Sequence, residues 1–60
     1  MTRFVLQNGF EHNCTLANLI NSCRISGFEM VDHQAINESV TVLYFRNAVL
    51  KKIEEVQMFN

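Results

Sequence analysis

Short apolar runs predict strands at three places in this chain of 60 residues. The first run lies in TRFVLQ, where Phe4, Val5 and Leu6 combine aromatic and aliphatic side chains and a turn signal follows. The other two runs, FEMVDHQ at 28–34 and SVTVLYFR at 39–46, are separated by AINE, which is typical of a hairpin loop. The last run is apolar on nearly both faces, and this predicts a central strand.

The Asn8-Gly9 dipeptide after the first run leaves two interpretations open. A two-residue hairpin turn at this point would pair Val5 with His12, and neither face of the two strands would be consistently apolar. The competing interpretation is a tight loop that leads into a helix, with Phe10 folded back on the core. We favour the loop, because burial would do little to hold the hairpin in that register.

A helical period begins after Thr15 and ends before Gly27. Threonine is a good N-cap residue, and glycine is a natural left-handed stop. The apolar face, at the i, i+3, i+4, i+7 spacing of one helix side, consists of Leu16, Leu19, Ile20 and Cys23. The outer face is expected to consist of Asn18, Asn21, Ser22 and Arg24.

A second helix is expected after Asn47, which is also a good capping residue. Its apolar stripe would consist of Val49, Leu50, Ile53 and Val56. The lysine pair at 51–52 precedes the glutamate pair at 54–55, the reverse of the order that the helix dipole favours, so this helix would depend on tertiary contacts. The order strand, helix, strand, strand, helix predicts one α+β domain over residues 1–60, with a mostly antiparallel sheet and helices packed on it.

Length and composition narrow the classes of protein that fit. A chain of 60 residues makes one domain at most, and 48% hydrophobic with 18% charged residues indicates a folded chain rather than a disordered tail. The formal net charge of −1 offers no general attraction to phosphate backbones or anionic membranes. Because there is neither a signal peptide nor an apolar run of about 18 residues, we expect a cytoplasmic protein with no membrane partner.

Four residues are potential zinc ligands: His12, Cys14, Cys23 and His33. Structural zinc sites usually bring ligands in close pairs such as Cys-x2-Cys, and only His12 and Cys14 are close here. If both cysteines lie along one helix they are roughly 13 Å apart, beyond the reach of a disulfide. We therefore expect free thiols in a reducing compartment, and neither a metal nor a cofactor.

Catalysis is not expected either. Cys14, next to the start of a helix, is the one candidate nucleophile, but the adjacent strand residues Asp32 and His33 point to opposite faces and cannot both assist it. The chain has no Gly-rich phosphate loop and no nucleophile elbow. So short a chain should also leave little room for a pocket of about 300 Å³ or more.

Excess apolar surface is the strongest functional signal. With helices on one face of the sheet, Val31, Leu43 and Phe45 or their alternates must occupy the other face. Interfaces combine apolar anchors with a polar rim, and the residues expected to contact a partner are Val31, Leu43, Phe45, Arg46, Glu54, Glu55, Val56, Met58 and Phe59. We expect a non-enzymatic, protein-binding regulator, such as an inhibitor, an antitoxin-like antagonist or an adaptor encoded by a phage or mobile element, that also forms a homodimer.

The alternative function is nucleic-acid binding. Arg46, Lys51 and Lys52 form the one basic cluster, and Tyr44 lies beside it, as in proteins that stack single-stranded bases on an aromatic ring. The glutamates at 54–55 weaken the positive field, and for this reason we favour protein binding. A thiol or zinc sensor is the third and least favoured function.

Overall fold

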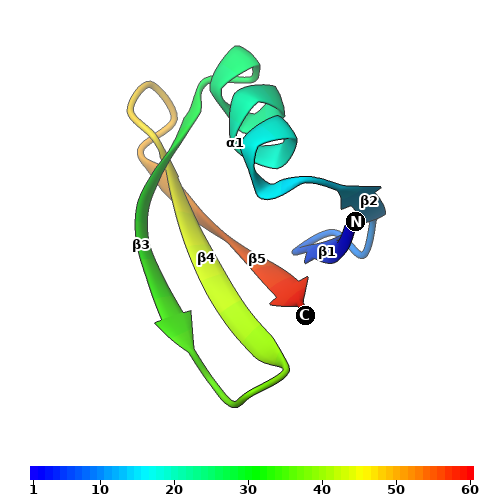
Figure 1. Ribbon diagram of the computed structural model, residues 1–60. Helices are drawn as coiled ribbons and strands as arrows, with labels where there is room; N and C mark the ends of the chain where they lie inside the picture. Colours follow the sequence, from blue (N-terminus) through cyan, green and yellow to red (C-terminus); the bar gives the residue numbers. More distant parts are fainter.

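The computed structural model describes residues 1–60, which form five strands and one helix (Figure 1). In chain order these are β1 (Thr2–Leu6), β2 (Glu11–Cys14), α1 (Leu16–Ile25), β3 (Phe28–Ala35), β4 (Val40–Asn47) and β5 (Lys52–Phe59). The strands form one antiparallel sheet in the order β2-β1-β5-β4-β3. The α+β prediction is confirmed, and the predicted order with two helices is wrong.

The Asn-Gly dipeptide closes a hairpin between β1 and β2, so the loop that we favoured is wrong. The turn has three residues: Leu6 N–H donates to the Phe10 carbonyl at 2.8 Å, and Gly9 N–H donates to the Leu6 carbonyl at 2.9 Å. Gly9 has a φ of +95°, as the last position of such a turn requires. Compared with a two-residue turn, the register moves by one residue and pairs Phe4 with His12. This shift places Phe4 and Leu6 on the same face as His12 and Cys14, and it places Val5 with Glu11 on the other face.

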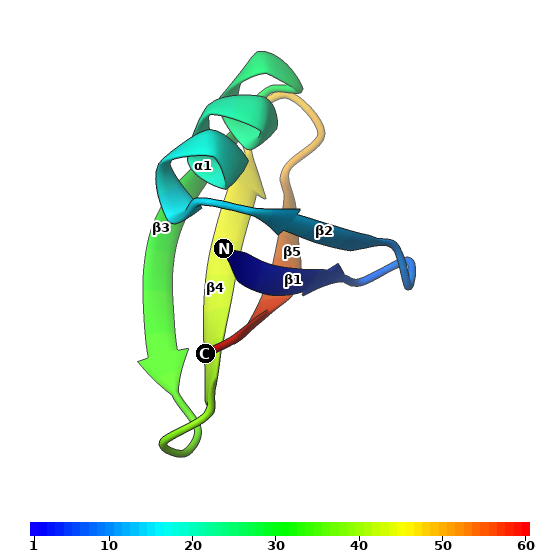
Figure 2. The same cartoon turned by 45° about the vertical axis from the view of Figure 1, so that its right-hand side comes forward.

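Helix α1 begins and ends where the sequence predicts. The Thr15 hydroxyl accepts a hydrogen bond from Asn18 N–H at 3.2 Å, and Gly27 takes a φ of +88° after the last turn. Leu19 is the one buried residue of the helix, and its side chain packs in the core. The helix runs directly into β3, and Leu19 packs against core residues of β1, β4 and β5. Figure 2 shows β1 and β2 crossing the long strands beside the helix.

Strands β3 and β4 form the predicted hairpin, with its loop at 36–39. As predicted for a central strand, β4 has a neighbour on each side. Leu43 and Phe45 are buried on its helix side, and Val42 is buried on the opposite face. The nearly continuous apolar sequence of β4 thus matches burial on both faces.

The second predicted helix is absent, because the chain turns at Asn47 and returns as β5. The Asn47 side chain does act as a cap, and its oxygen accepts from Val49 N–H at 3.0 Å and Leu50 N–H at 2.9 Å. Lys51 then takes a φ of +53°, which ends the turn, and both Val49 and Leu50 are exposed. Strand β5 bonds to β4 and β1 at once, whereas a helix here would leave one edge of each strand unpaired.

A small core lies between α1 and the sheet. It consists of Phe4, Leu19, Leu43, Phe45 and Val56. The large apolar side chains that remain exposed are Met1, Phe10, Leu16, Ile25, Val31, Ile36, Val49, Leu50 and Ile53. The single helix is too short to span a bilayer, so the structure contains no candidate membrane span.

Candidate functional site

Three of the residues predicted to contact a partner lie in the core. Leu43, Phe45 and Val56 face α1 and are buried. Their side chains are closed to a partner, and the structure corrects this part of the prediction. The reason is the direction of the side chains: in β4 the alternate residues, Val42 and Tyr44, take the face that α1 leaves uncovered.

The face of the sheet opposite α1 is called the open face. Strand pairing places the alternating residues of β3, β4 and β5 in rows across it. Its main side chains are Glu29, Val31, Asp32, Tyr44, Arg46, Ile53, Glu55 and Phe59. The open face therefore joins four of the predicted contact residues, Val31, Arg46, Glu55 and Phe59.

Two aliphatic side chains stand exposed on the open face, one on the edge strand β3 and one on β5. A β-bulge between Met30 and Asp32 leaves Val31 without a partner in β4, and Val31 is 53% exposed. Ile53 of β5 is 57% exposed. Both residues line a shallow hollow together with Tyr44. An aromatic ring between exposed aliphatic groups is typical of the centre of a protein contact surface.

Carboxylates flank this aromatic ring on both sides. Asp32 of β3 lies opposite Tyr44 in one strand pair, and Glu55 of β5 lies opposite it in the other. Glu29 lies in the next row, opposite Arg46, with no ion pair between them. None of these three acidic groups has an ion-pair partner in the structure. The centre of the open face therefore carries an excess of negative charge.

The other cation on this side is already engaged. The Arg3 guanidinium lies 3.2 Å from the Glu11 carboxylate and 4.4 Å from the centre of the Phe59 ring. Phe59 is half-buried at the end of β5, opposite Arg3 in the strand pairing. This stacked pair is a cation–π contact between the neighbouring strands β1 and β5.

Glu54 and Met58, the two other predicted contact residues, lie on the helix side of β5. Met58 is half-buried and packs against the core. Glu54 lies opposite Phe45 and lines a cavity beneath α1. Neither residue belongs to the open face.

The residues of the predicted nucleic-acid patch are divided between the two faces. Tyr44 and Arg46 lie on the open face. Lys52 lies opposite Asn47 on the helix side, and Lys51 lies in the turn before it. Because carboxylates also flank the tyrosine, these residues do not form one basic surface around an aromatic ring.

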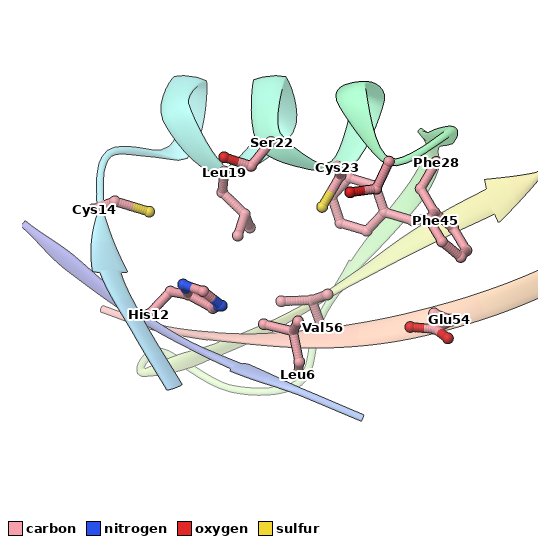
Figure 3. A pocket seen from close by; sticks show the side chains of 11 residues that line it. Leu6, His12, Cys14, Leu19, Ser22, Cys23, Phe28, Phe45, Glu54 and Val56 are labelled. Carbon is pink, nitrogen blue, oxygen red and sulfur yellow. The ribbon is translucent and has the colours of Figure 1, made fainter. Parts of the chain in front are cut away.

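A cavity of about 300 Å³ lies between α1 and the sheet, although we expected so short a chain to lack one (Figure 3). Its lining consists of Leu6, His12, Cys14, Leu19, Ser22, Cys23, Ser26, Phe28, Phe45, Glu54 and Val56. The helix forms the roof, and Leu6 and Val56 lie across the cavity from it. Ser22, which we expected on the outer face of the helix, lines the cavity with Ser26. Both serines are exposed residues at the edge of the cavity, and their small side chains leave it open.

Both cysteines line this cavity as free thiols. Burial raises the pKa of the Cys23 thiol, and the nearby Glu54 carboxylate and Cys14 raise it further. Cys23 is therefore protonated at neutral pH and is a poor nucleophile. His12 lies on the cavity wall, whereas His33 lies on β3 outside it. No three His, Cys, Asp or Glu side chains meet in a group that could hold a metal ion.

Comparisons of the chain with protein-family models, with curated proteins and with solved structures find no match. Function is therefore inferred from burial, charge and shape. Two features of the molecule are candidates, the open face and the cavity beneath α1.

Proposed function

We propose that this protein is a non-catalytic regulator that binds another protein through the open face. The observation that carries this proposal is the exposure of Val31 and Ile53, each more than half open to solvent, beside Tyr44 on a sheet face that no helix covers. Removing apolar surface from water favours association. Clustered exposed apolar groups on a small protein usually mark a partner surface.

Charge indicates what kind of partner fits. The open face offers Glu29, Asp32 and Glu55 without ion pairs, against Arg46 as the one unpaired cation. A complementary surface therefore presents apolar groups together with lysine or arginine side chains. Such pairing speeds encounter and excludes acidic partners, while the apolar contacts supply most of the affinity.

Binding of this kind is how an inhibitor, an antagonist or an adaptor acts, because covering a partner's surface requires no chemistry. The small size of the domain suits this role, because one face of the sheet is a large share of the surface of a chain of 60 residues. A partner that docks here would cover the long strands β4 and β5, each of which pairs with a neighbouring strand on both sides.

Self-association through the open face is the competing proposal. A second copy would bring the same unpaired carboxylates to the interface, so only a register that places Arg46 against Glu55 of the other copy would offset their repulsion. Residues 52–59, which the sequence predicted as a helix, are a strand in the sheet and offer no separate helix surface to a second copy.

The first test removes one apolar anchor. Ile53→Ser is compared with Val49→Ser, an equally polar change at an exposed valine in the β4–β5 turn, by affinity capture from the native cell extract. We expect the unchanged protein and Val49→Ser to retain the same partner, and Ile53→Ser to weaken its binding by about tenfold. Equal capture by all three proteins would contradict the proposal, provided that circular dichroism shows each to be folded.

The second test reverses one charge. Glu55→Lys on the open face is compared with Glu38→Lys in the exposed β3–β4 loop, so that both variants change the net charge equally. A basic partner should lose affinity for Glu55→Lys alone. Light scattering at several protein concentrations is run beside it: a concentration-dependent dimer that Ile53→Ser dissociates, with no other protein captured, would replace this proposal by self-association.

A further inference from the structure

The cavity beneath α1 has no part in the open face, and its origin can be read from the chain. Its roof carries Ser22, Cys23 and Ser26 where a closely packed helix would carry larger apolar residues. Leu19 is the only buried residue of the helix, so the helix fills little of the space between itself and the sheet. The core residues Leu19 and Val56 therefore border an opening instead of meeting one another fully.

The walls of the cavity determine the body of a ligand that fits it. Aromatic rings from Phe28 and Phe45 lie at one end, and the aliphatic side chains of Leu6, Leu19 and Val56 lie across the middle (Figure 3). The volume of about 300 Å³ is at the lower end of the range in which small molecules bind proteins. A small, mainly apolar group with a ring or a short branched chain matches this space.

One charged side chain determines the polar end of such a ligand. Glu54 is the only carboxylate on the lining, and no lysine or arginine lines the cavity with it. The structure gives Glu54 no ion-pair partner. The hydroxyl groups of Ser22 and Ser26 are further hydrogen-bonding groups on the lining. An apolar body with one cationic donor is complementary to this arrangement.

We infer that the cavity beneath α1 binds a small apolar molecule that carries one protonated amino group, with its apolar body between α1 and the sheet and its ammonium against Glu54. The site is independent of the open face, since Glu54 and Glu55 point to opposite sides of β5. A ligand in this cavity would also stabilise the folded protein, because it binds the folded state and not the unfolded chain.

Three probes of similar size test the inference: 2-phenylethylamine, 2-phenylethanol and 3-phenylpropanoate, each titrated into the ¹⁵N-labelled protein and followed by amide chemical shifts. We expect shifts to cluster at the cavity lining, with the amine bound about twofold to fivefold more tightly than the alcohol, as a partly exposed ion pair allows, and the carboxylate weakest. Glu54→Gln should make the amine and the alcohol bind with equal affinity. Glu55→Gln, with the same change of net charge on the opposite face, should leave the order intact.

A second pair of variants tests the place of binding. Ser22→Leu fills the roof and should weaken all three probes by about tenfold or more, while Asn21→Leu on the exposed side of the same helix should not. Ser26→Val serves in the same way if Ser22→Leu fails to fold. The inference is overturned if no probe shifts the lining amides, or if the preference for the amine survives in Glu54→Gln.

Discussion

The first and the last hairpin turns of this protein use the same device in different surroundings. In the β1–β2 turn the Asn8 side-chain oxygen accepts a hydrogen bond from Phe10 N–H at 3.0 Å, and Gly9 takes the left-handed conformation. In the β4–β5 turn Asn47 accepts from two backbone N–H groups, and Lys51 takes the left-handed conformation. The β3–β4 hairpin uses an asparagine in the same way. The Asn37 side-chain oxygen accepts hydrogen bonds from Ser39 N–H and Val40 N–H.

What differs is burial. The first turn is exposed throughout, whereas Asn47 is only 7% exposed and its amide group lies against Gly27 at the end of α1. One asparagine therefore closes a turn at the surface, and the other closes a turn and also fills the junction of helix and sheet. Both look alike in the sequence, because an asparagine that caps a helix and one that closes a turn make the same local bonds.

The largest expected effect is the difference between the two asparagines. Asn47→Ala removes two hydrogen bonds to turn amides and a buried side chain, and it should lower the free energy of unfolding by about 2 to 3 kcal/mol. Asn8→Ala removes one exposed hydrogen bond and should lower the free energy of unfolding by about 0.5 kcal/mol. Urea unfolding of both variants measures this, and equal losses would show that burial does not separate the two turns.

The glycines next to these asparagines sharpen the comparison. A Cβ at Gly27 would lie 3.2 Å from the Asn47 amide nitrogen, and one at Gly9 would meet nothing within 4 Å. Both positions have positive φ, so alanine is strained at each. We expect Gly27→Ala to cost about 2 kcal/mol and Gly9→Ala about 1 kcal/mol in thermal or urea unfolding. The idea of a crowded junction is refuted if Gly9→Ala is the worse variant.

Lys51 offers a gain of stability instead of a loss. A lysine in the left-handed conformation is strained, and Lys51→Gly should raise the free energy of unfolding by about 0.5 kcal/mol after the extra entropy of glycine is counted. Lys52→Gly is the matched control, because residue 52 is extended in β5 and glycine should weaken it. A loss for both variants would mean that Lys51 is not strained.

The smallest effect distinguishes the turn from the helix that the sequence suggested. Val49 is 90% exposed in the β4–β5 turn, and Val49→Ser should change the free energy of unfolding by less than about 0.5 kcal/mol. On the buried stripe of a helix the same change would cost several times more. If Val49→Ser lowered the free energy of unfolding by several times this amount in a chemical unfolding experiment, residues 48–56 would have to be a helix after all.

The candidate sites were predictable to different degrees. Val31 could be predicted for the open face because an uncovered sheet face must carry alternate residues of its strands. Glu55 was expected on a helix and lies on this face only because residues 52–59 form β5. Leu43 and Phe45 were placed on the wrong side, since an apolar run on both faces does not say which set meets the helix. The cavity was missed because its volume depends on where α1 packs, which no local pattern encodes.

Local sequence by itself determined α1 with its Thr15 cap and Gly27 stop, and the hairpin of β3 and β4, because the caps are local and the two strands are joined by a short loop at 36–39. Only the tertiary structure decided that residues 52–59 form a strand and that the first hairpin has a three-residue turn. Strand β5 takes its hydrogen bonds from β4 and from β1 at the far end of the chain. The apolar spacing of residues 49–56 suits a helix, but a strand here pairs the backbone groups of both β4 and β1. Leaving those groups unpaired would cost more free energy than the local helix propensity provides.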